Sequence, residues 1–133
     1  MDTIKRNKLV ASLSSEPEPQ LVSIREFFDG NDDPGSIGCN LMEHPGIESF
    51  SAVLTGLLNR KDVDAVYAQI AELDPGPDSW PFTDTILVVG SISDGDLSQI
   101  LKPLEPDEVG PIDTAPEFIV QRHQSPVLSA WWD

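Results

Sequence analysis

Apolar residues recur at helical spacing in two parts of the chain. Residues 45–59 are predicted to form the longest helix, because apolar side chains three and four positions apart would share one face and Pro45 suits the first turn. A second, shorter helix is predicted to begin at a cap supplied by Ser93 or Asp94 and to run to Leu101. The apolar positions of the longer helix are Ile47, Phe50, Val53, Leu54, Leu57 and Leu58.

Four segments carry strand signals. Residues 85–91 (TILVVGS) are predicted to be a buried strand, since they are β-branched and almost wholly apolar. Residues 64–73 would tolerate a helix, but their alternation favours a strand. Residues 8–13 and 126–132 are the predicted first and last strands, and residues 117–121 would add another before the last.

The resulting order is strand, helix, strand, strand, helix, strand. This order predicts an α+β, ferredoxin-like fold with both helices on one face of an antiparallel sheet. The length fits a single domain over residues 1–133, in which residues 1–8 are left as a segment that can be flexible.

Between the first predicted strand and the long helix lies an unusual loop over residues 29–40. Ser23 and Glu26 just before it fit a capping box, which predicts one helical turn ending at Asp29. Glycine, proline and Asn/Asp residues favour turns in the loop, while flanking and internal apolar side chains predict that it is ordered. Those apolar anchors are Phe27, Phe28, Ile37, Cys39 and Leu41.

Charge changes the picture most. Twenty-three Asp and Glu residues face eight Lys and Arg residues, giving a formal net charge of −15. Three of the cations lie in the first eight residues, and neither 26–48 nor 62–96 contains any. Such a surface repels nucleic acid and anionic membranes and attracts basic proteins. The longest apolar run, Ile86–Val89, is too short to span a bilayer, so a cytoplasmic protein is expected.

The loop partly matches a calcium-binding pattern. Asp29, Asn31 and Asp33 have EF-hand-like spacing, but Pro34 stands where a glycine belongs and Asn40 where a bidentate Glu belongs. A metal-dependent enzyme or metal-binding domain using residues 29–40 therefore remains an alternative. The favoured interpretation is that these side chains close turns and that the protein has no cofactor.

No complete catalytic constellation is visible. Cys39 and His44 are close enough in sequence to meet, and His123 could join them at zinc, but the spacing matches no common zinc motif. An orienting group and an oxyanion hole are not recognisable nearby. We expect Cys39 to be a buried structural cysteine, His44 to lie at the start of a helix, and the protein not to be an enzyme.

Two adjacent tryptophans, Trp131 and Trp132, precede the last residue. Neighbouring residues of a strand face opposite sides, so one ring can enter the core while the other lies on the surface as a binding anchor. The sequence leaves open the alternative that both are covered.

Several strings together resemble a group of small acidic bacterial proteins of unassigned function. The resemblance spans roughly residues 20–133 and implies no activity. Size, acidity and the lack of catalytic motifs are also similar to immunity proteins of bacterial toxin systems, a likeness of composition alone. The strings are Phe27–Leu41 (FFDGNDDPGSIGCNL), His44–Gly46, Trp80–Phe82, Pro106–Glu108 and Ala130–Asp133 (AWWD).

The expected function is that of an acidic module that binds a basic protein partner, such as an immunity-type inhibitor of a toxin. A non-catalytic homodimeric structural or regulatory subunit is another alternative. The expected partner-binding residues are Asp29, Asp32, Asp33, Glu43 and Trp132.

Overall fold

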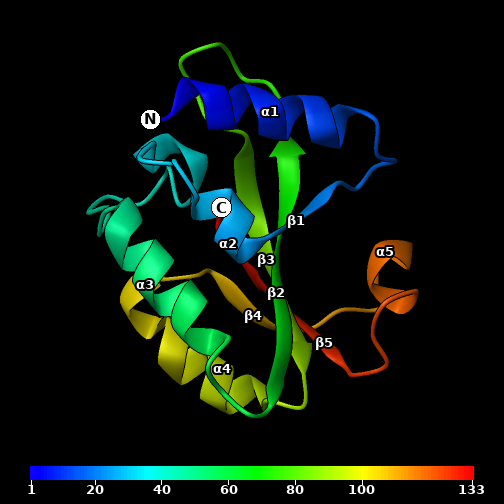
Figure 1. The fold of residues 1–133 in the computed structure, drawn as a ribbon. Coiled ribbons are helices and arrows are strands. Elements are labelled where there is room, and N and C mark those ends of the chain that lie inside the picture. Colours follow the sequence, from blue (N-terminus) through cyan, green and yellow to red (C-terminus); the bar gives the residue numbers. More distant parts are fainter.

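The chain folds around one five-stranded antiparallel sheet with the spatial order β1-β2-β3-β5-β4 (Figure 1). The structure is a computed structural model and describes residues 1–133. The predicted α+β class and antiparallel sheet are confirmed. The strands are β1 (Leu21–Ser23), β2 (Val63–Glu72), β3 (Phe82–Gly90), β4 (Glu108–Pro111) and β5 (Val127–Trp131).

Helices lie on both faces of this sheet. Helices α2, α3 and α4 cover one face, over the larger apolar core, while α5 packs on the other face (Figure 1). On that second face, Ile119 of α5 forms a smaller cluster with Leu21, Leu87 and Val89. The helices are α1 (Thr3–Ser14), α2 (Ile24–Phe28), α3 (Ile47–Leu57), α4 (Asp94–Leu101) and α5 (Glu117–Val120), with 3-10 turns η1 (Pro34–Ser36) and η2 (Lys102–Leu104).

The helix signals before α2 and α4 are confirmed at their caps. The Ser23 hydroxyl accepts a hydrogen bond from the Glu26 backbone N–H (3.4 Å) and donates one to the Glu26 carboxylate (3.1 Å). Ser93 accepts from the Asp96 N–H at 3.1 Å in the same way. Each hydroxyl satisfies a backbone donor that the first turn of a helix leaves free.

The prediction of a strand at residues 8–13 is wrong, because that segment belongs to α1. Arg6 and Leu13 are the only buried residues of this helix. The Arg6 guanidinium pairs with Asp74 and donates to the Ser79 carbonyl at 3.0 Å. Because one of the two buried side chains of α1 is an arginine, the helix has no apolar stripe that a hydropathy pattern could reveal.

The other differences lie in the C-terminal third. The prediction of a strand at residues 117–121 is wrong, since a helical turn forms there and buries Ile119. No strand was predicted between residues 103 and 117, but this segment contains the four-residue strand β4, which ends in Pro111. The elements α3, β2, β3, α4 and β5 follow the predicted order, but the first strand is β1 instead of residues 8–13, and it pairs directly with β2. No helix has the length and apolar character needed to cross a membrane.

The turn after β3 requires a glycine. The Asp62 carbonyl accepts hydrogen bonds from the N–H groups of Ser91 (2.8 Å) and Ile92 (3.2 Å), and this brings the backbone before β2 against the end of β3. A Cβ atom on Gly90, whose φ is +156°, would lie 2.2 Å from that carbonyl oxygen. The added atom would therefore clash with the backbone of Asp62 and Val63, which is part of the paired strand region and cannot move aside as a flexible side chain could.

We therefore expect Gly90→Ala to lower the free energy of unfolding by at least about 2 kcal/mol, because backbone must move to relieve the clash. Gly56→Ala is the control, since its added Cβ meets nothing within 4 Å in α3. That change should raise stability by up to about 1 kcal/mol. Urea denaturation followed by circular dichroism measures both, and equal effects of the two substitutions would contradict the packing described.

Candidate functional site

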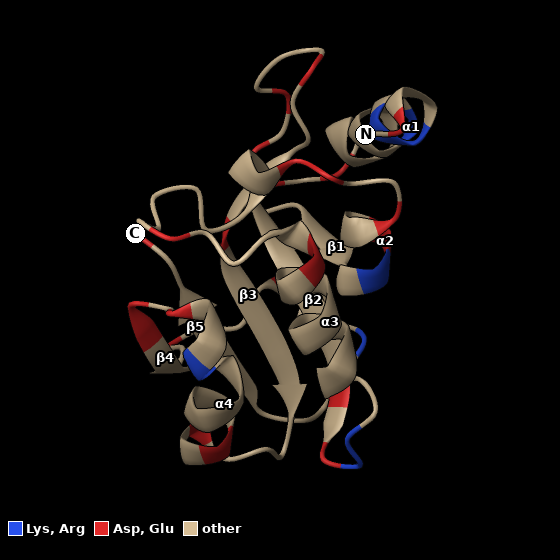
Figure 2. Cartoon of the chain, turned by 90° about the vertical axis from the view of Figure 1, so that its left-hand side faces the viewer, with Lys and Arg blue, Asp and Glu red and all other residues tan.

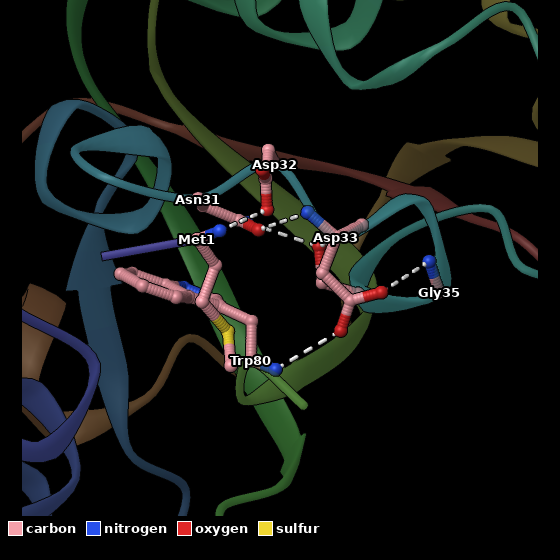
Figure 3. A network of polar contacts seen from close by, with 7 residues as sticks. Met1, Asn31, Asp32, Asp33, Gly35 and Trp80 are labelled. Atoms are coloured by element: carbon pink, nitrogen blue, oxygen red, sulfur yellow. Dashed lines mark hydrogen bonds and ion pairs between the residues drawn. The ribbon is translucent and has the colours of Figure 1, made fainter. Parts of the chain in front are cut away.

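The loop over residues 29–40 closes on its own polar side chains (Figure 3). Asp33 accepts hydrogen bonds from the Gly35 N–H at 2.9 Å and from the Trp80 N–H at 3.0 Å. Asn31, which is buried, accepts from the Asp33 N–H at 2.9 Å and donates to the Ser36 hydroxyl at 3.0 Å. These are the turns expected of Asx residues, and they tie the loop to the start of β3.

Two other acids of this loop pair with the N-terminal part of the chain. Nζ of Lys5 lies 2.7 Å from Oδ1 of Asp29, and the hydrogen bond to this carboxylate raises the pKa of the Lys5 ammonium. The Met1 ammonium lies 2.8 Å from Asp32, and the hydrogen bond between them lowers the pKa of that carboxyl group. Asp29, Asp32 and Asp33 are thus engaged within the chain, which makes them weaker candidates for charged contacts with a partner.

The side chains of the calcium-like pattern do not converge. Asp29 turns to Lys5, while Asn31 and Asp33 bind backbone and hydroxyl groups of the loop itself. Nowhere in the chain are three or more His, Cys, Asp or Glu side chains grouped so that they could hold a metal ion.

The cysteine and the two histidines do not form a group that could hold a metal ion. The expectation that Cys39 is buried is wrong, because its side chain is exposed. The Gly46 N–H donates to Nδ1 of His44 at 2.9 Å, so Nε2 carries the proton and donates to the Ile37 carbonyl at 2.8 Å. His44 therefore fixes the backbone before α3. His123 binds the Tyr67 hydroxyl at 2.9 Å, and burial raises the pKa of that phenol.

Trp132 is a core residue, so its predicted role as an exposed anchor is wrong. Its side chain is 2% exposed, and its indole N–H donates to the Leu104 carbonyl at 2.8 Å. The ring also meets Phe50 of α3 edge-on, with centroids 5.7 Å apart. Alternation along the strand then places Trp131 on the opposite face of the sheet.

An open groove of about 870 Å³ lies where the chain's last residue meets the loops before α3 and β4. Four of its lining residues are acidic, namely Glu43, Glu105, Asp107 and Asp133, and no Lys or Arg lines it. None of these four side chains forms an ion pair within the chain. Figure 2 shows red segments near β4 and the C-terminus. We call this feature the acidic groove.

Two hydrogen bonds hold Asp133 in place beside the other residues of the acidic groove. The Asp133 N–H donates to the Asp107 carboxylate at 2.6 Å, and the Asn40 side chain donates to the Asp133 carbonyl at 3.1 Å. Glu105 holds a left-handed backbone conformation with φ of +53°, which few residues other than glycine adopt. Met42 stands beside the groove with a fully exposed side chain.

Sequence reasoning found only Glu43 among the acids of this groove. Glu105 and Asp107 lie in a segment that carries no helix or strand pattern, and Asp133 follows the tryptophans without a motif of its own. The groove exists because β5 lies beside β4 and Trp132 is buried at the end of that pair. Neither fact is visible in local patterns.

The fold and this site define a class: a small acidic α+β protein with an open acidic groove and no assembled metal centre. The chain belongs to the family described as Uncharacterized protein YfbO, whose model matches residues 4–130. It is 29% identical over 121 residues to Uncharacterized protein YfbO from Escherichia coli (strain K12), covering 88% of this chain and 84% of that protein. No solved structure matches the chain. The predicted likeness to a group of uncharacterised bacterial proteins is confirmed.

Asp33→Ala should lower the free energy of unfolding by about 1–3 kcal/mol, because the N–H groups of Gly35 and Trp80 lose their acceptor. Asp78→Ala is a matched control that removes an exposed carboxylate with no hydrogen bond or ion pair in the fold, and it should change stability by less than about 0.5 kcal/mol. Urea denaturation compares the two. Equal losses would show that Asp33 acts only through its charge.

Calcium or magnesium at millimolar concentration should leave the melting temperature unchanged. A ligand that binds the native state stabilises it by mass action, whereas the polar groups of the 29–40 loop already bind one another. Differential scanning fluorimetry with a sodium control at equal ionic strength measures this. A saturable rise in melting temperature that Asp33→Ala abolishes would restore the metal-binding alternative.

Proposed function

We propose that this chain is a non-catalytic binding module whose acidic groove docks onto a basic segment of a protein partner. The single observation behind this proposal is that four acidic residues line one open groove without a cation among them. Carboxylates that line one groove give it a negative potential, and a cationic partner is attracted to that potential. The groove therefore favours binding of Lys or Arg side chains.

The net charge of −15 supports the same partner chemistry at longer range. A strongly negative protein accelerates its encounter with a positive one and rejects nucleic acid. Met42 adds an apolar contact beside the carboxylates, and unbranched methionine side chains adapt to varied surfaces. Together these features favour a protein partner whose surface carries Lys or Arg side chains around a small apolar patch.

The groove replaces the loop acids as the centre of the proposed interface. Asp29 and Asp32 already pair with cations of the chain, and Asp33 closes a turn. Glu43 is the residue shared by the sequence-based expectation and the groove. An immunity-type inhibitor of a basic toxin is one specific form of this proposal, in which the exposed Met42 and Glu43 would enter the toxin's cleft.

The test uses a hexalysine peptide carrying a fluorophore, with a hexaserine peptide as the neutral control. Hexalysine should bind wild-type protein, and the double variant Glu43→Gln with Glu105→Gln should bind it about threefold to tenfold more weakly. Raising salt from about 0.01 M to about 0.1 M should weaken wild-type binding, because the screening length falls to about 10 Å. Fluorescence anisotropy measures the affinities.

The matched control is Glu72→Gln with Asp78→Asn, which removes the same charge from exposed positions outside the acidic groove. It should change the affinity less than twofold. Equal weakening by both double variants would show that net charge alone attracts the peptide. Binding of hexalysine no tighter than hexaserine would overturn the proposed function.

A further inference from the structure

Trp131 is a large aromatic side chain at the end of β5 that lies outside both apolar clusters. It is half-buried, yet it belongs to neither the main apolar core nor the smaller cluster beneath α5. Its ring pairs with no other aromatic ring, whereas Trp132 contacts Phe50. Trp131 therefore contributes little to the main apolar core, whereas Trp132 is part of it.

One neighbour of Trp131 in the sheet is exposed and carries a negative charge. Glu108 of β4 lies directly opposite it in the sheet, which puts the two Cβ atoms about 4.5–5.5 Å apart. The Glu108 side chain is exposed and forms no ion pair in the fold. Beside this pair lies Gly110, where an added Cβ would meet nothing within 4 Å. The position of a side chain at Gly110, next to the Trp131–Glu108 pair, is therefore unfilled.

A partly exposed indole beside a carboxylate is suited to binding a guanidinium group. Tryptophan has the strongest cation–π attraction among the aromatic side chains, and the carboxylate adds a hydrogen-bonded ion pair. A planar guanidinium can stack on the indole and bind the carboxylate at the same time, which an ammonium does less well. The fold already contains one such cation–π pair, in which Cζ of Arg122 lies 3.7 Å from the centroid of the Phe118 ring.

We infer that Trp131 and Glu108 form a docking position for an arginine side chain of the basic partner. This inference rests on the proposed function. It extends the proposed binding surface from the acidic groove to the neighbouring Trp131 and Glu108 at the end of β5 and β4. Asp107 precedes Glu108, Asp133 follows Trp132, and both acids line the acidic groove. A basic segment can therefore occupy the groove and place one arginine over Trp131.

The experiment compares hexaarginine and hexalysine peptides on wild-type protein and on variants. Trp131→Ala should weaken hexaarginine binding about threefold to tenfold and reduce the preference for hexaarginine over hexalysine. Trp131→Phe should retain part of that preference, and Glu108→Gln should weaken hexaarginine binding. Val127→Ala is the control, because it truncates another half-buried residue on the same face of β5 and should leave affinity within about twofold.

Each outcome decides between the two proposals. If Trp131→Ala leaves hexaarginine affinity unchanged while Glu43→Gln with Glu105→Gln weakens it, the Trp131 position is wrong and the proposed function stands. If neither basic peptide binds more tightly than hexaserine, the proposed function fails and this inference fails with it. Should Trp131→Ala not fold, Trp131→Leu keeps the apolar bulk without the aromatic face and must give the same loss.

Discussion

The burial of Trp132 at the end of β5 is the interaction on which the rest of the surface depends. Its indole hydrogen bond to Leu104 joins the last strand to η2, and its ring reaches Phe50 of α3. Because side chains alternate along a strand, fixing Trp132 inward fixes Trp131 outward. The same interaction brings Asp133 next to Asp107 and so completes the acidic groove.

Charge divides the surface into two unlike regions. On one side the cations of α1 and the Met1 ammonium neutralise acids of the 29–40 loop, and Arg6 ties α1 to the segment before β3. On the other side no Lys or Arg lines the acidic groove, and its four acids form no ion pair. Surface ion pairs contribute little stability individually. Their effect here is to leave the acidic groove as the less neutralised of the two regions.

Regular patterns predicted the regular parts of the fold. The helices α3 and α4 and the strands β2, β3 and β5 follow from apolar periodicity and from a serine cap, since those elements bury one face. Helix α1 could not be predicted this way because Arg6 anchors it. Strand β4 has four residues and ends in Pro111, so its presence depends on pairing with β5.

The site was less accessible to sequence reasoning than the fold. The adjacent tryptophans suggested one buried and one exposed ring, with burial of both as the alternative, and Trp132 was predicted to bind a partner. In the structure Trp132 is buried and Trp131 is half-buried. Glu43 was the one groove acid that the sequence indicated, because its partners come from segments about 60 and 90 residues away. Convergence of that kind depends on the order of strands in the sheet.

The most direct test of this account is the stability of the two tryptophan variants side by side. Trp132→Ala should lower the free energy of unfolding by about 3–5 kcal/mol, because it empties a core position and leaves the Leu104 carbonyl without its donor. Trp131→Ala should lower it by no more than about 1 kcal/mol, since that ring packs in neither cluster. Urea denaturation that gave equal losses, or the reverse order, would contradict the account.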